Sequence, residues 1–313
     1  MYLLVDLGGT NCRCALSTTQ GNIFAHEDFI NRKYDSLTQI LGLFLERQKH
    51  KVEYAAVSVA APVRGSRVRM TNLPWVVCTR EIESALGLGK AVLLNDFAAV
   101  ALALPYLEDS QLIEVKTGDS EKYSPKVLLG PGTGLGVGGL IYASNQWHPV
   151  AGEGGHVTQS AISESQREVL RELYGRFDHV SAEKVNSGMG LQHLYQALSA
   201  GNDKKLLEIP EAEEITSAAI AGEKLARKAL DLFYEFLAIN AGNLALTFGA
   251  MGGIYLAGGI LPKIKTDFLE SGFVEQLLEK DRFAKYIDPI PVYLIVEPYP
   301  AFIGLNRYLN YCA

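Results

Sequence analysis

The chain has 313 residues, which is enough for one large domain or two of ordinary size. Apolar residues make up 48% and charged residues 20%, the balance of a globular protein with a substantial core. The formal charge is −6 and no basic block occurs, which argues against a nucleic-acid surface because phosphate binding needs clustered Lys and Arg.

The N-terminal apolar run is short and ends at Asp6, with neither the basic start nor the cleavage site of a signal peptide. No stretch approaches the length needed to cross a bilayer. We therefore expect a cytoplasmic protein that binds no nucleic acid and no membrane. The four cysteines are too few for a disulfide framework and lack metal spacing, so Cys12 and Cys14 are interpreted as small core residues of a strand.

The first hundred residues alternate strand and helix patterns. Residues 2 to 16 predict a strand, a tight glycine turn and a second strand, and residues 22 to 29 a third strand. Residues 36 to 50 carry apolar side chains at helical spacing, and residues 54 to 63 form an apolar run typical of a buried strand. Residues 91 to 104 then predict a strand that passes directly into a helix.

A similar glycine hairpin recurs at residues 126 to 142, which indicates an internal duplication, although two ordinary hairpins would give the same pattern. Residues 160 to 217 are polar and helix-prone, and residues 222 to 248 predict one long helix. Residues 252 to 262 and 290 to 296 predict late strands, and residues 300 to 313 a final helix. The end of the helix after Asp96 places a domain boundary near residue 106.

The first glycine turn, "DLGGT", spans Asp6 to Thr10. Gly8 and Gly9 can adopt positive φ and leave no side chain between the backbone and a bound group. Successive amides in such a turn can form an anion-binding nest, with the Thr10 hydroxyl as a further donor. Asp6 could hold a hydrated Mg²⁺, because a hard cation prefers carboxylate oxygen and keeps several waters. A plain hairpin turn explains this short motif equally well.

The second turn, "GPGTGLGVGG", has six glycines in ten residues, which indicates close approach of the backbone to a phosphate or else a set of bulged strands. It matches neither the G-x-x-x-x-G-K-S/T loop nor a strand-to-helix G-x-G-x-x-G. A third cluster, "GGIYLAGGI", ends in Gly258 and Gly259. These glycines could let the backbone lie against a base or ribose, or they could form a simple turn.

The polar candidates begin with Asn95 and Asp96, between a predicted strand and helix. Either residue could simply cap the helix, and capping is compatible with chemistry, because strand ends in open α/β sheets are where ligands bind. Glu153, His156 and Glu183 suit a neutral polyhydroxy ligand, since carboxylate, amide and imidazole groups can all hydrogen bond hydroxyls. Glu183 could instead be an acidic residue in a first helical turn, and His156 a structural histidine.

The ordered motifs "DLGGT", "NDF", "GPGTGLG", "GEGGH", "HVSAE" and "LAGGI" resemble the bacterial glucokinase family of the hexokinase–actin–Hsp70 superfamily, over nearly the whole chain. The resemblance implies an α/β fold of two RNase-H-like (actin-like ATPase) lobes with a central interlobe cleft. We assign residues 1–106 with 297–313 to a small α/β domain and residues 107–296 to a large one. Gly130 stands where actin and Hsp70 carry Asp, and the cysteine motif of the ROK sugar kinases is absent.

The resemblance also implies an ATP-dependent glucose kinase with Mg²⁺ as a cofactor, commonly a homodimer. Asp96 would be the catalytic base at the sugar 6-hydroxyl, and Mg²⁺ would bind Asp6 through water. The other hydroxyls would be bound by Asn95, Glu153, His156 and Glu183. The residues implied at the ATP phosphates and adenosine are Val5, Asp6, Leu7, Gly8, Gly9, Thr10, Gly132, Thr133, Gly134, Gly258 and Gly259.

Two alternatives stay open at this point. The phosphoryl acceptor could be another hexose or an N-acetyl hexosamine. In a different class, the chain could be an actin-like or chaperone ATPase without a sugar substrate, against which Glu153, His156 and Glu183 argue through the family match. A catalytically inactive sugar sensor is disfavoured because Asp96 is present.

Overall fold

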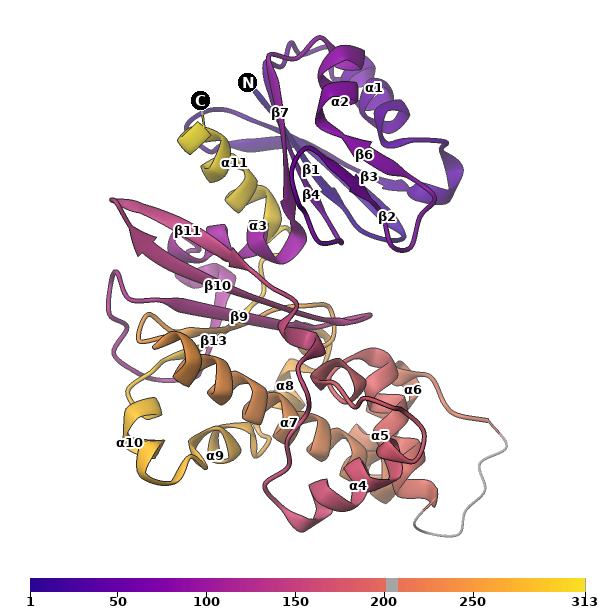
Figure 1. The fold of residues 1–313 in the computed structure, drawn as a ribbon, viewed down its shortest axis with the longest axis vertical. Helices are drawn as coiled ribbons and strands as arrows, with labels where there is room; N and C mark the ends of the chain where they lie inside the picture. The colour runs from indigo at the N-terminus through magenta and orange to yellow at the C-terminus, as the bar shows by residue number, and fades with distance from the viewer. Residues whose placement is uncertain (201–207, 313) are drawn as a thin grey trace. The chain divides into compact units, whose positions relative to one another are not determined.

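The computed structural model describes residues 1–200 and 208–312. These residues form two compact units (Figure 1). The first unit comprises Met1–Glu108, Ala143–Gly152 and Glu297–Ala313, and the second comprises Asp109–Tyr142 and Glu153–Val296. The segment 143–152, which the sequence-based division assigned to the large domain, therefore groups with the first unit.

The strands are β1 Tyr2–Leu7, β2 Asn11–Ser17, β3 Ile23–Ile30, β4 Tyr54–Val59, β5 Arg67–Arg69, β6 Val76–Cys78, β7 Lys90–Asn95, β8 Leu112–Lys116, β9 Lys126–Pro131, β10 Leu135–Ala143, β11 Gln146–Ala151, β12 Ile254–Leu256 and β13 Val292–Ile295. The α-helices are α1 Leu37–Gln48, α2 Thr79–Leu86, α3 Asp96–Ala103, α4 Glu164–Tyr174, α5 Gly188–Ala200, α6 Ala212–Ile220, α7 Lys224–Phe248, α8 Lys265–Leu269, α9 Phe273–Leu278, α10 Ala284–Ile287 and α11 Pro300–Cys312.

The sheet of the first unit has the order β3-β2-β1-β4-β7. Strand β2 is antiparallel to both of its neighbours, β1 and β3, whereas β1, β4 and β7 run parallel. Alternate residues of a strand face opposite sides, so β1 contributes to two layers. Leu3 and Val5 belong to the core that includes residues of α1 and α2, whereas the hydroxyl of Tyr2 donates to Asn310 Oδ1 of α11 at 3.1 Å. The sheet is therefore covered by helices on both faces (Figure 1).

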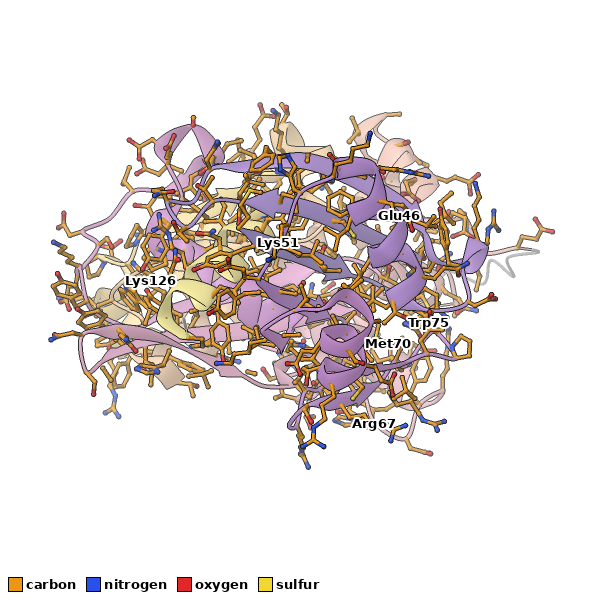
Figure 2. All side chains as sticks on the ribbon, turned by 90° about the horizontal axis from the view of Figure 1, so that it is seen from above. Glu46, Lys51, Arg67, Met70, Trp75 and Lys126 are labelled. Carbon is orange, nitrogen blue, oxygen red and sulfur yellow. The ribbon has the colours of Figure 1, made fainter. Side chains whose placement is uncertain are left out.

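A short hairpin, β5–β6, extends the first unit beyond this sheet. The amide of Met70 donates to the carbonyl of Trp75 at 3.0 Å, and both side chains are buried. Figure 2 labels these two residues together with Arg67 at the start of β5. The hairpin, which the sequence patterns did not indicate, adds apolar side chains to the core of the first unit.

The sheet of the second unit repeats the strand order of the first. Its strands β10-β9-β12-β13, in this order, correspond to β2-β1-β4-β7 of the first sheet: β9 pairs antiparallel with β10 and parallel with β12, and β12 pairs parallel with β13. Each sheet thus has an antiparallel glycine hairpin followed by two parallel strands, which is the duplication that the repeated glycine hairpins predicted. The edge strand β8, absent from the sequence prediction, pairs antiparallel with β13.

The long helix α7 is the centre of the second unit's core. It spans 25 residues and contacts β9, and α5, α6 and α9 pack against it (Figure 1). The Glu223 side chain caps its N-terminus by accepting from the amide of Ala226, and Gly249 ends it in the left-handed conformation, φ 60°. The predicted helix at 222 to 248 is confirmed. The helix-prone segment 160 to 217 contains α4, α5 and most of α6, and its residues 201–207 lie outside the described residues.

Candidate active site

The first glycine turn and the Asn95–Asp96 pair lie at one edge of the first unit's sheet. Leu7, the last residue of β1, pairs with Val59 of β4, and Val59 pairs with Asn95 of β7. The carboxyl ends of three parallel strands therefore meet at the same level, where open α/β sheets bind ligands. Strands are spaced by about 4.8 Å, which places the backbones of Leu7 and Asn95 roughly 10 Å apart.

The first turn is held in shape by Asn31, a residue that sequence reasoning missed. The side-chain Nδ2 of Asn31 donates to the carbonyl of Gly8 at 2.9 Å, and the backbone amide of Asn31 donates to the carbonyl of Thr10 at 2.9 Å. Asn31 is 1% exposed. Neither Gly8 nor Gly9 has positive φ, contrary to the reason expected for these glycines. The requirement at Gly9 is space instead, because a Cβ there would lie 3.3 Å from the Cβ of Asn72.

Asp6 lies within β1 and has two side-chain partners. Arg13 Nη1 donates to its Oδ2 at 3.0 Å, and Ser58 Oγ donates to its Oδ1 at 2.8 Å. Both partners face Asp6 across the sheet, Arg13 from β2 and Ser58 from β4. The pairing with Arg13 follows from the hairpin register, so a fully drawn β1–β2 hairpin would have found it. The pairing with Ser58 needs the parallel contact between β1 and β4, which no local pattern specifies.

Asn95 is the N-cap of α3, as the capping interpretation predicted for this pair. Its backbone is extended (φ −67°, ψ 147°), and its Oδ1 accepts from the amide of Ala98 at 3.1 Å. Its Nδ2 donates to Oδ1 of Asp96 at 2.9 Å, and the amide of Phe97 donates to the same oxygen at 2.9 Å. Asp96 is half-buried. The residue that caps the helix therefore also orients the carboxylate of Asp96.

The second glycine turn joins β9 to β10 in the second unit, at the same sheet edge as Gly258. The amide of Gly132 donates to the carbonyl of Gly134 at 2.8 Å, and Thr133 is exposed. Leu129 of β9 pairs with Leu256 of β12, so the strand ends that precede the two glycine clusters adjoin. Gly258 has φ +83°, and a Cβ there would lie 2.3 Å from the carbonyl oxygen of Pro131. Glycine is therefore required at 258 both by conformation and by space.

Glu183 lies directly on this second turn. It belongs to a short 3₁₀ helix, Ala182–Lys184, and its Oε2 accepts from the amide of Leu135 at 2.9 Å. A Cβ added to Gly134 would lie 2.4 Å from the same carboxylate oxygen. One of the six glycines in the turn is thus explained by a glutamate side chain. The structure brings a candidate sugar-binding residue and the candidate phosphate turn into contact.

Glu153 precedes a 3₁₀ helix, Gly154–His156, that ends with His156 and packs on the start of β10. A Cβ at Gly155 would lie 2.1 Å from the carbonyl oxygen of Leu135, and one at Gly154 would lie 2.7 Å from Cγ1 of Val137. Glycines at 154 and 155 allow this close packing, and both Glu153 and His156 are exposed to solvent. The segment also contacts the 3₁₀ helix of Glu183.

The candidate residues therefore form two groups, each within one unit. The first unit brings together Val5 to Thr10, Asn95 and Asp96, with Arg13, Asn31 and Ser58 as additions. The second unit brings together Gly132 to Gly134, Glu153, His156, Glu183, Gly258 and Gly259.

The described residues were compared with the requirements of a metal-binding cluster and of a membrane-spanning helix. Over residues 1–200 and 208–312, no group of three or more His, Cys, Asp or Glu side chains is arranged to hold a metal ion. Within the same residues, no helix is both long and apolar enough to pass through a bilayer.

Comparison with known proteins places the chain in a family. A family model described as Glucokinase matches residues 3–311. A protein named glucokinase from Photorhabdus laumondii is 39% identical over 310 residues, covering 98% of this chain and 96% of the relative. A bifunctional protein named glk from Burkholderia pseudomallei is 40% identical over 308 residues, which cover 98% of this chain but 48% of that protein. The chain thus spans about half the length of this relative.

A solved structure supports the same placement. The crystal structure of a glucokinase from an Antarctic psychrotroph is 34% identical, with a TM-score of 0.91, and the match covers 99% of this chain and 98% of that one. The two-unit α/β fold described above is therefore the actin-like fold of these sugar kinases, as the ordered motifs predicted. On the family model and on these relatives, the chain belongs to the glucokinase family.

Proposed function

We propose that this chain transfers the γ-phosphoryl group of ATP to the 6-hydroxyl of D-glucose, giving glucose 6-phosphate and ADP. The observation that carries the proposal is the carboxylate of Asp96, oriented at the start of α3 on the sheet edge that also carries the first glycine turn. The glucokinase relative that matches over 96% of its length supports glucose as the acceptor.

Asp96 is proposed as the base. Its carboxylate accepts the proton of the 6-hydroxyl as the bond from that oxygen to the γ-phosphorus forms and the bond from the γ-phosphorus to the bridging oxygen of ADP breaks. Phosphoryl transfer has a loose transition state, so alignment and charge stabilisation supply most of the catalysis. The backbone amide of Phe97 and the side-chain amide of Asn95 both donate to one oxygen of Asp96 and fix its direction. This suits a base that must align a hydroxyl.

The remaining sugar hydroxyls are proposed to bind Asn95, Glu153, His156 and Glu183. These side chains combine carboxylate acceptors with an amide and an imidazole that also donate, as a ligand with several hydroxyls requires. Exposure of Glu153 and His156 leaves both able to meet a ligand. The contact of Glu183 with Gly134 supports placing the sugar beside a phosphate-binding turn.

The nucleotide is proposed to bind both glycine turns. The amides of residues 5–10 and 132–134 would face the phosphates, and Gly258 and Gly259 the adenosine. The Nε of Arg13 is buried without a hydrogen-bond partner among the described residues, and Arg13 is paired with Asp6. A buried donor that lacks an acceptor supports an anionic ligand near this turn.

Mg²⁺ is proposed to bind beside Asp6 through water. The Asp6 side chain is 20% exposed, and each of its oxygens accepts one hydrogen bond and keeps a lone pair for a metal-bound water. The adjacent guanidinium of Arg13 disfavours direct metal contact, so the donor set fits a hydrated ion held mainly by phosphate oxygens. When bound, the ion would neutralise charge on those oxygens.

The location, oligomeric state and partners of the enzyme are proposed on the basis of the same family relationship. The chain would act in the cytoplasm as a homodimer, without nucleic-acid or membrane partners. Sedimentation velocity of the purified chain at several concentrations measures the dimer directly.

The experiment that tests the function is an assay of ADP release, coupled to NADH oxidation, with a panel of hexoses and N-acetyl hexosamines. We expect ADP release that requires sugar and is fastest with glucose. Faster release with an N-acetyl hexosamine would establish a different acceptor. ADP release at the same rate with and without any sugar would identify an ATPase and contradict the proposal.

Replacement of Asp96 by Asn tests the base. An amide cannot take the proton, so we expect turnover to fall by about 10²- to 10⁴-fold, the usual contribution of a positioned acid or base. Glucose affinity, measured by calorimetry in the presence of a non-hydrolysable ATP analogue, should change little because the amide keeps the shape and one acceptor. Turnover within a factor of a few of the parent would remove Asp96 from this role.

A further inference from the structure

A buried amide on α7 connects the two segments that carry the proposed sugar-binding residues of the second unit. The Nδ2 of Asn240 donates to Oε1 of Gln159 at 2.9 Å and to Oδ1 of Asn186 at 2.8 Å. The three residues are 8%, 3% and 0% exposed, so both hydrogen bonds are shielded from water. Gln159 lies three residues after His156, and Asn186 lies three residues after Glu183.

The backbone joins the same two segments. Thr158 and Ser181 form an antiparallel bridge, the amide of Gln159 donates to the carbonyl of Val180 at 2.9 Å, and the amide of Ala182 donates to the carbonyl of Val157 at 2.9 Å. His156 and Glu183 thus each lie next to one of two backbone segments that pair with each other. Asn240 contacts this pair from the side of the core.

The orientation of each amide in this network is determined by its other partners. Gln159 Nε2 donates to the carbonyl of Ser160 at 2.9 Å, and Asn186 Nδ2 donates to the carbonyl of Phe233 at 2.8 Å. Their oxygens therefore face Asn240, whose two N–H groups are both used. Removing Asn240 leaves two buried oxygens without these donors, and a buried acceptor that lacks a donor is costly enough to shift its segment.

The residues beside Asn240 in α7 are apolar, so packing of the helix does not by itself call for an amide at this position. Its neighbours Ala238, Ile239 and Ala241 are buried apolar residues, and α7 presents an apolar surface to the rest of the core. An apolar residue at 240 would continue this surface. An amide there instead specifies where residues 156–159 and 183–186 lie relative to each other, which is the relation that a pocket for a rigid polyol must hold.

We propose that Asn240 is a positioning residue for the sugar, which keeps His156 and Glu183 at the spacing that glucose hydroxyls require. This inference rests on the proposed function, because it takes both residues to bind the sugar. Asn240 is buried and is assigned no contact with the sugar itself. Its loss should weaken glucose binding while leaving ATP binding intact, whereas a merely structural residue would affect stability without this selectivity.

The test compares two substitutions at Asn240 with two at a matched residue. Asn240→Asp keeps the shape but removes both donors, and Asn240→Leu replaces the amide by an apolar group. Asn306 of α11 is the control: it is 1% exposed and its Nδ2 also serves two acceptors, Ser17 Oγ at 2.9 Å and the carbonyl of Thr18 at 2.8 Å. All four variants remove one buried amide that has two acceptors.

We expect both Asn240 variants to raise the KM for glucose by about ten-fold or more, since a displaced side chain leaves a sugar hydroxyl without its partner. The KM for ATP should stay within about two-fold of the parent. Variants at Asn306 should lose comparable stability in thermal unfolding but keep both KM values. If the Asn240 variants do not fold, Gln159→Met removes one connection alone and should raise the KM for glucose in the same direction.

Two further variants separate failure of this inference from failure of the proposed function. Glu183→Gln and His156→Ala alter the proposed sugar ligands directly. If they raise the KM for glucose while folded variants at Asn240 and Gln159 do not, the positioning role is wrong and the sugar site stands. If they too leave glucose binding unchanged, the sugar site itself is wrong, and the inference with it. Equal KM changes at Asn240 and Asn306 would also overturn the inference.

Discussion

Gly134 shows how one residue can serve two parts of a site. Its position in a glycine-rich turn predicted close backbone approach to a phosphate. The structure shows a different neighbour as well, because the carboxylate of Glu183 occupies the space that a Cβ at 134 would take, at 2.4 Å. The same carboxylate accepts from the amide of Leu135. Glycine at 134 thus keeps Glu183 in place, and the proposed phosphate and sugar contacts depend on each other.

Gly134→Ala is predicted to weaken glucose binding more than it weakens folding. The clashing atom is the end of a flexible side chain, so Glu183 can rotate away at the loss of one hydrogen bond, about 1 kcal/mol of unfolding free energy. The KM for glucose should rise by about ten-fold, because a displaced ligand leaves a hydroxyl unpaired. Gly132→Ala, which meets nothing within 4 Å, should leave glucose affinity unchanged. Equal glucose affinity in the parent and Gly134→Ala would refute this reading.

At the scale of elements, α11 controls the position of α3 and so of Asp96. The two helices contact each other extensively in the first unit (Figure 1). The helices approach closely at Gly304, since a Cβ there would lie 1.8 Å from the carbonyl oxygen of Ala99 and 3.1 Å from the amide nitrogen of Ala103. Both atoms are backbone, which cannot rotate away. A residue larger than glycine must push the helices apart.

Gly304→Ala and Gly42→Ala make the same change in two helices, and they should change the free energy of unfolding in opposite directions. Gly304→Ala should destabilise the first unit by about 1–3 kcal/mol, the usual range for overpacking. It should also lower turnover by moving α3. Gly42 of α1 meets nothing within 4 Å, so alanine there should stabilise by about 0.5–1 kcal/mol through helix propensity. Urea unfolding checks both signs, and a Gly304→Ala variant as stable as the parent would contradict the packing argument.

For the molecule as a whole, one buried lysine sets a pH dependence of stability. Lys126 at the start of β9 is 5% exposed, and its Nζ donates to the carbonyl of Gly252 at 2.7 Å (labelled in Figure 2). Burial lowers the pKa of Lys126 from 10.5 to about 8. Between these two values the unfolded chain binds this proton more strongly than the folded one. The contribution of Lys126 to unfolding free energy therefore rises with pH across that window.

Lys126→Met is predicted to remove this rise. Below pH 8 the lysine is charged in both states and its burial is unfavourable, and by pH 10.5 that penalty has gone. The unfolding free energy of the parent minus that of Lys126→Met should therefore increase by about 3 kcal/mol from pH 7 to pH 10.5, at 1.36 kcal/mol per pKa unit. Urea titrations at pH 7, 8.5 and 10 follow the difference, in which ionisation of the tyrosines cancels. A flat or falling difference would show that Lys126 is not desolvated.

Local patterns in the chain were sufficient for much of the fold and for the helix cap at Asn95. Glycine hairpins at 2–16 and 126–142, the long helix ending before Gly249, and the cap at Asn95 all depend on residues within a few positions of each other. Such features depend on backbone sterics, side-chain spacing and short-range hydrogen bonds. The roles assigned to Asp96, Glu153, His156 and Glu183 came from the family resemblance and remain predictions.

Distant contacts supplied the rest. The contacts of Ser58 with Asp6, of Asn31 with the first turn, of Glu183 with the second turn and of Asn240 with Gln159 join residues between 23 and 81 positions apart. None of these pairs leaves a mark in composition or periodicity, because a polar residue looks the same whether its partner is water or a buried amide. Their partners are chosen by strand register and helix packing, which depend on the burial of the whole core at once.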